Sequence, residues 1–331
     1  MKAVTLKKLA PVALLCTFAL GASAQESTGE CGLRIATGPK TGVYTLLAND
    51  IQKVCGNVTT LCPVPSTGGL QNLMALSASE ADIGFTQLDV LQKMGQEGDQ
   101  NIAALQAIMP MHANLLHVLT KSGGSKVDVN PYVPFSGSVK TFAKFSDLKG
   151  AQVALVGSAQ LLGATLEKQT GYGMRFVAAD TDDQAVAQLL AGHIQAVFTT
   201  GGWPYPAVSK HAATSGLMLA DYDLSAQAPF AVVKRNYVKL NAFNLHFLAA
   251  PNLLVTRPFR PNGEKGKLVN ALQSCILSHL DELQEGAYHA VWKEIRNPLD
   301  TLGVARWEGP RVRIAQQTPR PRSTAQQGQR E

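Results

Sequence analysis

Three short segments rich in glycine, serine and threonine carry residue types that could hold a negatively charged molecule. They span residues 37–44, 65–69 and 86–89. Glycine lets the backbone approach a ligand closely, and the free N–H groups that open a helix bind carboxylate or phosphate with help from the helix dipole. The candidate binding residues in and beside these segments are Gly38, Lys40, Thr41, Gly42, Tyr44, Ser66, Thr67, Gly68, Asn72 and Gln87. They predict a site for a small anionic solute.

A simpler interpretation is that each segment only caps a helix or forms a turn, since Gly, Ser and Thr are also preferred there. For any one segment the two interpretations weigh equally. Three such segments at equivalent positions of one sheet favour a binding site. Asp89 could bind an amine or cap the helix that follows it, and the cap is the simpler role.

The elements that must position these segments alternate between short apolar strands and amphipathic helices. We predict strands over residues 33–37, 58–64 and 83–86, and helices over 43–54 and 69–79. This alternation is typical of a parallel sheet covered by helices. Because ligands bind outside the carboxyl ends of parallel strands, the three segments should converge at one edge of the sheet.

A second unit of the same kind begins at Lys149. It predicts strands over residues 152–156, 174–178 and 196–199, and helices over 161–170 and 182–191. Residues 76–85 and 189–198 form a weak internal repeat, which indicates two lobes of similar construction.

Between and after these units lie the segments that must join the two lobes. The pattern breaks for some thirty residues after about Leu119, and a strand over 252–255 and helices over 263–283 and 286–295 follow later. We therefore predict an α/β fold with two lobes, each with a central sheet, joined by a hinge. Lobe I comprises residues 31–116 plus 251–308, and lobe II comprises residues 117–250 with the hinge crossings.

The two ends of the chain differ from its body. Residues 1–24 combine three Lys, an apolar run and a small-residue cleavage site, which predicts a secretory signal and a periplasmic protein. The apolar run is shorter than the ~20 residues that a membrane-spanning helix needs. Residues 309–331 carry five Arg and one Glu and are expected to form a disordered basic tail. The body between these ends is nearly neutral, which argues against a nucleic-acid partner.

Four cysteines follow the signal, and an oxidising compartment would let them form disulfides. Cys31 precedes the first strand and Cys55 ends the helix that runs back along it, so we predict a disulfide between these two. The alternative is a bridge between Cys55 and Cys62. The cysteines and histidines have no spacing typical of a metal site, and His112 and His117 are interpreted as structural residues.

The sequence also lacks the motifs of common enzymes. It has no Gly-x-Ser-x-Gly elbow, Walker loop or His-Glu-x-x-His, and Gly171 and Gly173 are not followed by the third glycine of a dinucleotide site. We therefore expect neither catalysis nor a cofactor.

The runs LRIATGPKTGVYTLLA and PSTGGLQNLMALSASEADIGFTQLDV resemble the TAXI family of solute receptors for TRAP transporters. The resemblance extends from about Leu33 to Ile295 and implies a type II periplasmic-binding fold. It also implies a dicarboxylate, keto acid or acidic amino acid as the solute, a monomer, and a TRAP permease in the membrane as partner. An alternative with the same fold is a receptor for a sensor kinase or a stand-alone scavenger.

The resemblance assigns contacts from both lobes. Lobe I would use Thr41, Gly42, Tyr44, Ser66, Thr67, Asn72 and Gln87. Lobe II would use Ser158, Gln160 and the turn from Gly201 to Pro206, which contains Gly202, Trp203 and Pro204. Lys40, the segment 157–163 and Trp203 depart from the usual family pattern. Trp203 could stack on the solute as a lid or fill the lobe interface, and we favour the lid.

Overall fold

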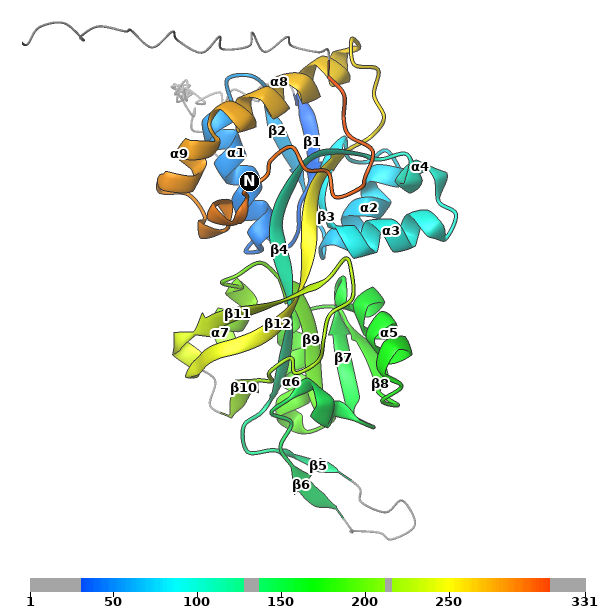
Figure 1. Ribbon diagram of the computed structural model, residues 1–331, viewed down its shortest axis with the longest axis vertical. Coiled ribbons are helices and arrows are strands. Elements are labelled where there is room, and N and C mark those ends of the chain that lie inside the picture. Colours follow the sequence, from blue (N-terminus) through cyan, green and yellow to red (C-terminus); the bar gives the residue numbers. More distant parts are fainter. Residues whose placement is uncertain (1–30, 128–136, 212–215, 310–331) are drawn as a thin grey trace, which may run out of the picture. The chain divides into compact units, whose positions relative to one another are not determined.

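The computed structural model describes residues 31–127, 137–211 and 216–309 (Figure 1). The predicted signal, and the predicted tail from residue 310 onward, lie outside these described residues. None of the described helices is both long and apolar enough to cross a membrane.

The first half of lobe I alternates strands and helices as the apolar pattern predicts. Its elements are β1 (Leu33–Ala36), α1 (Val43–Cys55), β2 (Leu61–Val64), α2 (Gly69–Ser77), β3 (Ile83–Gln87), α3 (Leu88–Gln96) and α4 (Gln100–Ala103). Strand β1 pairs in parallel with both β2 and β3. The carboxyl ends of these strands therefore face the same edge, where the three predicted binding segments follow them.

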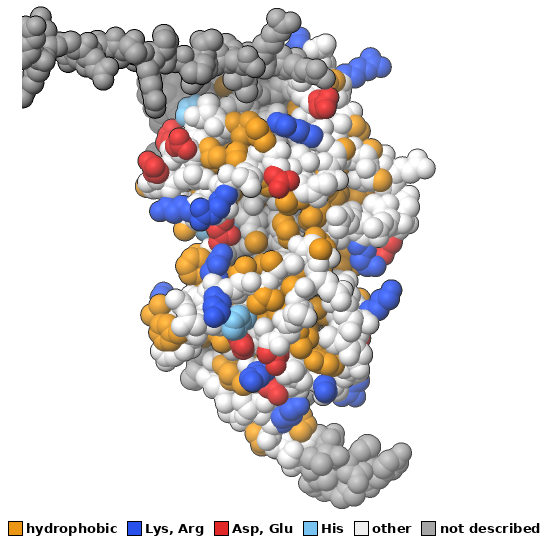
Figure 2. All heavy atoms as spheres, viewed as in Figure 1, with side chains coloured by type: hydrophobic (Ala, Val, Ile, Leu, Met, Phe, Trp, Pro, Cys, Tyr) orange, Lys and Arg blue, Asp and Glu red, His pale blue; other side chains and the backbone are white. Residues whose placement is uncertain are grey.

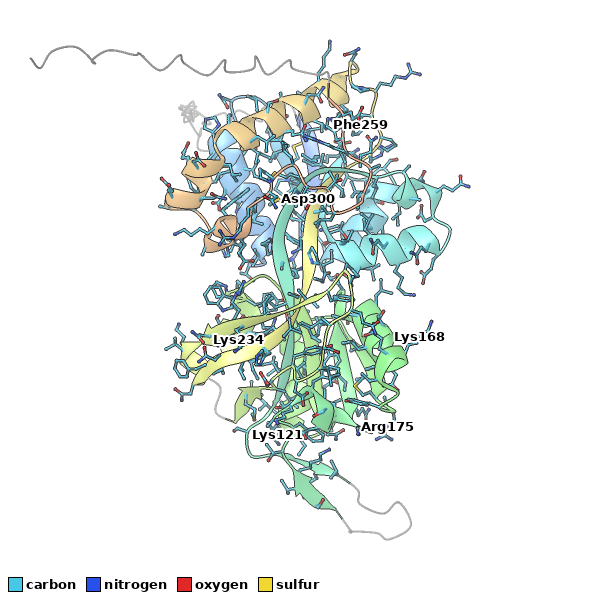
Figure 3. All side chains as sticks on the ribbon, in the orientation of Figure 1. Lys121, Lys168, Arg175, Lys234, Phe259 and Asp300 are labelled. Atoms are coloured by element: carbon cyan, nitrogen blue, oxygen red, sulfur yellow. A yellow bond between two sulfur atoms is a disulfide. The ribbon has the colours of Figure 1, made fainter. Side chains whose placement is uncertain are left out.

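Lobe II contains a matching parallel unit. Its elements are η1 (Phe145–Leu148), β7 (Gln152–Val156), α5 (Ala159–Thr170), β8 (Arg175–Ala179), α6 (Asp182–Ala191), β9 (Ala196–Gly201) and α7 (Pro206–His211). Strand β7 pairs in parallel with both β8 and β9. The outer surface of this lobe carries exposed charges such as Lys168 and Arg175 (Figure 3).

The two parallel units are joined through two long strands, β4 (Gln106–Lys121) and β12 (Ala242–Thr256). The strand order is β2-β1-β3-β12-β4-β9-β7-β8, with β12 antiparallel to β3 and β4 antiparallel to β9. The predicted α/β fold is confirmed, but the two expected sheets form one hydrogen-bonded sheet because β4 and β12 belong to both lobes. The proposed lobe boundaries near residues 116 and 251 fall within these strands.

The remaining helices and strands lie outside the two parallel units and the two long strands. They are β5 (Ser125–Val127), β6 (Ser138–Lys140), β10 (Leu217–Leu219), β11 (Ala231–Tyr237), η2 (Val238–Leu240), α8 (Glu264–Ser278), α9 (Leu280–Glu285) and η3 (Ala290–Glu294). The predicted helix over 263–283 is interrupted at His279, and the one predicted over 286–295 contains only the short 3-10 helix η3. Val291 and Trp292 of η3 are both buried. The segment is therefore held in place by the packing of these side chains, although it forms no long helix.

Each lobe has apolar cores on both faces of its sheet. In lobe I, one core joins α1, α8 and η3 to the sheet, and the other lies under α2, α3 and α4. Two further cores flank the lobe II strands. On the face seen in Figure 2, the Lys and Arg side chains of the described residues are interspersed with Asp and Glu.

The disulfides differ from the prediction. Cys31 pairs with Cys62, and Cys55 pairs with Cys275. Because Arg34 lies opposite Cys62 in the parallel β1–β2 ladder, the chain just before β1 reaches the second strand and not the helix end. Cys55 instead faces α8, which packs against α1 in the same core. The predicted Cys31–Cys55 bridge and its Cys55–Cys62 alternative are therefore both wrong.

Candidate functional site

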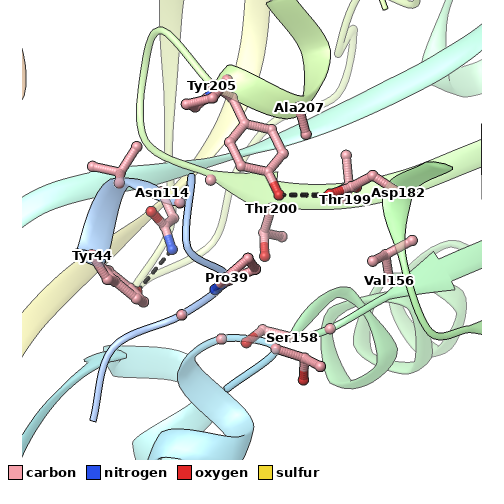
Figure 4. A pocket seen from close by; sticks show the side chains of 18 of the residues that line it. Pro39, Tyr44, Asn114, Val156, Ser158, Asp182, Thr199, Thr200, Tyr205 and Ala207 are labelled. Carbon is pink, nitrogen blue, oxygen red and sulfur yellow. Dashed lines mark hydrogen bonds between the residues drawn. The ribbon is translucent and has the colours of Figure 1, made fainter. Parts of the chain in front are cut away.

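A cavity of about 450 Å³ lies where loops from the two lobes meet (Figure 4). Its walls are the chain segments that follow β1, β2 and β3 in lobe I and β7, β8 and β9 in lobe II. The location agrees with the rule that ligands of parallel sheets bind beyond the carboxyl ends of the strands. Its size is within the range of small-molecule sites.

Most of the sequence-predicted binding residues line this cavity. They are Gly38, Thr41, Gly42, Tyr44, Ser66, Thr67, Gly68 and Gln87 from lobe I, with Ser158 and Gly202 from lobe II. The structure does not place Lys40, Asn72, Gln160, Trp203 or Pro204 in the lining. Lys40, Gln160 and Pro204 are exposed instead.

Four helices begin at the cavity after an N-cap residue whose own side chain does not cap the helix. Helices α1, α2, α3 and α5 follow Gly42, Gly68, Gln87 and Ser158, and none of these four residues makes a side-chain cap hydrogen bond. The first turns of α1, α2 and α5 also contain no acidic residue. The partial positive charge at the starts of α1, α2 and α5 therefore has no acidic side chain in the same turn, whereas Asp89 lies in the first turn of α3.

Asn72 lies behind the cavity wall and joins the loops that form it. Its side-chain amide donates to the carbonyl of Thr37 and, at 2.7 Å, to the carbonyl of Phe85. Its oxygen accepts a 2.6 Å hydrogen bond from the Ser66 hydroxyl. Because Asn72 is fully buried and these contacts engage its amide, it holds the ends of β1, β2 and β3 together and does not face a solute.

Tyr44 is anchored by a buried polar network at the crossing strands. Its hydroxyl donates to Asn252 Oδ1 at 2.7 Å and accepts from Asn114 Nδ2 at 2.9 Å. His112 Nε2 lies 3.1 Å from Asn114 Oδ1, and burial lowers the pKa of His112 to about 3. Burial also raises the pKa of Tyr44. The network fixes the start of α1 against β4 and β12.

The lobe II wall contains residues that the sequence analysis missed. The missed residues are Asp180, Thr181, Asp182 and Asp183, and beside them lies Tyr205 of the predicted 201–206 turn. Tyr205 donates from its hydroxyl to Asp182 Oδ2 at 2.9 Å (Figure 4). Residues 180–183 follow β8, so the strand-end rule that identified the lobe I segments could have found them. The sequence analysis assigned Asp182 and Asp183 only to the start of a helix.

Trp203 packs against lobe II and does not line the cavity. Its indole N–H donates to the carbonyl of Asn236 at 3.1 Å, and the Arg235 guanidinium lies 5.5 Å from the ring centre. These contacts hold the indole on β11. The stacking of Trp203 on a solute as a lid stays a prediction, and in this structure the indole lies on β11 and outside the cavity lining.

The two lobes touch beside the cavity through small residues. The N–H of Leu70 donates to Ser158 Oγ at 3.2 Å, which joins the start of α2 to the start of α5. A Cβ atom at Gly157 would lie 2.9 Å from the Thr67 carbonyl oxygen, and one at Gly202 would lie 2.7 Å from the His112 ring. Glycine at these positions permits the close approach.

The fold and the cavity together define the class of protein. Two α/β lobes joined by crossing strands, with a cavity at the strand ends between them, form the type II fold of periplasmic binding proteins. The chain belongs to the NMT1-like family, whose family model matches residues 35–297.

Several solved structures have a similar arrangement at low sequence identity. An amino acid ABC transporter substrate-binding protein from Streptococcus pneumoniae, bound to L-arginine, is 16% identical, with a TM-score of 0.48 over 80% of this chain and 91% of that chain. An arginine transport system periplasmic binding protein from Legionella pneumophila is 12% identical, with a TM-score of 0.46 over 80% of this chain and 100% of that chain. An ancestral arginine-binding protein bound to arginine is 15% identical, with a TM-score of 0.47 over 76% and 96% of the two chains.

Proposed function

We propose that this chain is an extracytoplasmic receptor, and not an enzyme, that binds a small solute in the interlobe cavity. One observation carries the proposal: the starts of α1 and α2 in lobe I reach the cavity with no acidic residue in their first turns. Such helix starts stabilise a bound anion by typically 0.3–1 kcal/mol each when exposed, and by up to ~2 kcal/mol when partly buried. The solute therefore presents a carboxylate or similar anionic group to lobe I.

Hydroxyl groups beside the helix starts would fix the orientation of that anionic group. Thr41 and Thr67 lie in the cavity lining next to α1 and α2, whereas the Ser66 hydroxyl already donates to Asn72. A hydroxyl donates one hydrogen bond and rotates to suit its acceptor. Dicarboxylates, keto acids and acidic amino acids all satisfy this requirement, and so does the carboxylate of the L-arginine that the similar solved proteins bind.

A periplasmic location and a membrane transporter as partner complete the proposal. The motif resemblance supports a TRAP permease, which uses an ion gradient, whereas the similar solved structures include proteins of ABC systems, which use ATP. Deletion of the gene should abolish solute uptake if the chain serves either transporter. Uptake that persists would instead favour the sensor or scavenger alternative.

The proposal is tested by a melting-temperature screen of the purified protein against dicarboxylates, keto acids, amino acids and neutral sugars. A true solute at a hundred times its dissociation constant should stabilise the protein by ~2.7 kcal/mol. We expect only compounds with a carboxylate to raise the melting temperature. Stabilisation by neutral sugars alone would show that the helix starts do not bind an anion.

A further inference from the structure

The lobe II wall of the cavity has the opposite electrostatic character to the lobe I wall. Among its side chains are three carboxylates, on Asp180, Asp182 and Asp183, and one ammonium group, on Lys210. Lys210 Nζ lies 2.6 Å from Asp183, and His211 Nε2 lies 2.8 Å from the other oxygen of that carboxylate. Within the described part of the chain, Asp180 and Asp182 have no basic partner. The lining therefore retains two uncompensated carboxylates.

The start of α6 accounts for part of this acidity but not for all of it. Acidic residues in a first turn are favourable, and Thr181 already caps this helix by accepting from the N–H of Gln184. Asp182 Oδ2 accepts from Tyr205, but Asp182 Oδ1 is buried without a hydrogen-bond partner among the described residues. A buried acceptor without a donor is unfavourable. The helix dipole thus explains why an acidic residue is favourable at position 182. It does not supply a hydrogen-bond donor for Asp182 Oδ1.

Gln87 provides a second, independent acceptor from lobe I. Its residue is 1% exposed, it lines the same cavity, and its Oε1 also has no partner within residues 31–127, 137–211 and 216–309. A Cβ atom at Gly69 would lie 3.3 Å from both Gln87 Oε1 and Ser158 Oγ, so this amide sits close to where the lobes touch. Asp182 Oδ1 on the lobe II wall and Gln87 Oε1 on the lobe I wall are both buried acceptors without a donor from the residues that the structure describes. A ligand that donates hydrogen bonds would satisfy them.

We propose that Asp182, assisted by Asp180, forms a subsite for a positively charged nitrogen at the lobe II end of the cavity, and that the Gln87 amide oxygen accepts a further hydrogen bond from the same solute. The inference rests on the proposed function, because lobe I is assigned the anionic group of the same solute. The solute is then bipolar, with a carboxylate at the helix starts and an ammonium or guanidinium group at Asp182. Among the solute classes considered above, amino acids meet this requirement, whereas dicarboxylates and keto acids do not.

The test compares pairs of probes that differ chiefly in one positive group. These pairs are L-alanine with pyruvate, L-glutamate with 2-oxoglutarate, and L-arginine with L-citrulline. Affinities are measured by isothermal titration calorimetry on the wild-type protein and on Asp182→Asn, Asp180→Asn and Asp281→Asn. Asparagine at position 182 can still accept the Tyr205 hydrogen bond, and Asp281 is an exposed residue of α9, outside the cavity. Melting curves without ligand confirm that each variant is folded.

We expect the member with the additional positive group to bind at least ~10-fold more tightly in one or more pairs. Asp182→Asn should remove most of that preference, Asp180→Asn should reduce it, and Asp281→Asn should leave it unchanged. If Asp182→Asn is unfolded, the Asp180→Asn result decides.

Three outcomes overturn the inference. If 2-oxoglutarate or pyruvate binds and no bipolar probe binds more tightly than its partner, the cation subsite is wrong while the anion-binding function stands. The same conclusion holds if the preference survives in both folded cavity variants. If none of the six probes binds and no carboxylate raises the melting temperature in the wider screen, the proposed function fails together with the subsite.

Discussion

At the scale of single residues, several predicted ligands act through other residues. Tyr44 is an example: the sequence suggests a hydroxyl for the solute, but the structure commits that hydroxyl to Asn252 and Asn114. The side-chain amide of Asn72 likewise donates to two backbone carbonyls and not to a solute. Both side chains position the helix starts, which in turn face the cavity.

We predict that Tyr44→Phe destabilises the protein by about 1–3 kcal/mol, because it leaves buried amide groups of Asn252 and Asn114 without their partner. Urea unfolding measures this change. Tyr222→Phe is the matched control, since the Tyr222 hydroxyl makes no hydrogen bond with another described residue. A loss for Tyr44→Phe no larger than that of the control would contradict the assigned network.

Asp89 lies in the first turn of α3, and we predict that its buried carboxyl group makes the stability of the protein depend on pH. Burial raises the pKa of Asp89 to about 6. The folded state therefore holds this proton more tightly than the unfolded state, so the contribution to stability is full at pH values below about 4 and is lost as the pH rises through about 6. A shift of about two units corresponds to roughly 3 kcal/mol.

Asp89→Asn should accordingly stabilise the protein at pH 7.5 by up to roughly 3 kcal/mol and have little effect below pH 4. Urea unfolding across this pH range measures the difference, with Asp281→Asn as the exposed control. Equal effects of Asp89→Asn at both ends of the range would show that the carboxyl is not a buried acid.

At the scale of elements, the sequence predicts the strands and helices of the two parallel units well. The residue patterns that specify them each lie within a short stretch of the chain. The apolar strands, the helix periods and the glycine segments at strand ends are all visible within windows of a few residues. The prediction of α6 over residues 182–191 is confirmed by the structure, and β7 is also found where it was predicted.

Features that depend on partners distant in the chain could not be predicted. Strands β4 and β12 contain His112, Asn114 and Asn252, which look polar in sequence and are buried only because they satisfy one another across the sheet. The disulfide partners depend on how α8 packs against α1. The Asp180–Asp183 wall was missed because two of its carboxylates also fit an ordinary helix start.

The loop after β7 gives a test at this scale. Gly157 and Gly171 have nearly equal φ angles, 57° and 59°, but only Gly157 faces the backbone of Thr67. Alanine in this left-handed region costs about 1–2 kcal/mol, so Gly157→Ala and Gly171→Ala should reduce stability similarly. Only Gly157→Ala should also weaken solute binding, by ~10-fold or more, because its Cβ pushes the lobes apart.

Titration calorimetry with a solute identified by the melting screen measures this difference. Equal affinities for the two variants would mean that the contact between Gly157 and Thr67 is not needed to hold the solute.

At the scale of the described molecule, β4 and β12 are the elements through which the lobes can move. Strand β12 pairs with β3 of lobe I and β11 of lobe II, and β4 pairs with β12 and with β9 of lobe II, so we expect bending within these two strands to open or close the cavity without breaking either parallel unit. A solute that contacts both walls would favour the closed arrangement by its differential affinity for it. The opposite electrostatic character of the two walls gives the solute a defined direction.

The most direct test of the account is a crystal structure of the protein with the solute that raises its melting temperature most. The account predicts the solute in the interlobe cavity, with its carboxylate within hydrogen-bond distance of backbone N–H groups at the starts of α1 or α2. A solute bound elsewhere, or one whose carboxylate lies away from every one of these helix starts, would contradict it.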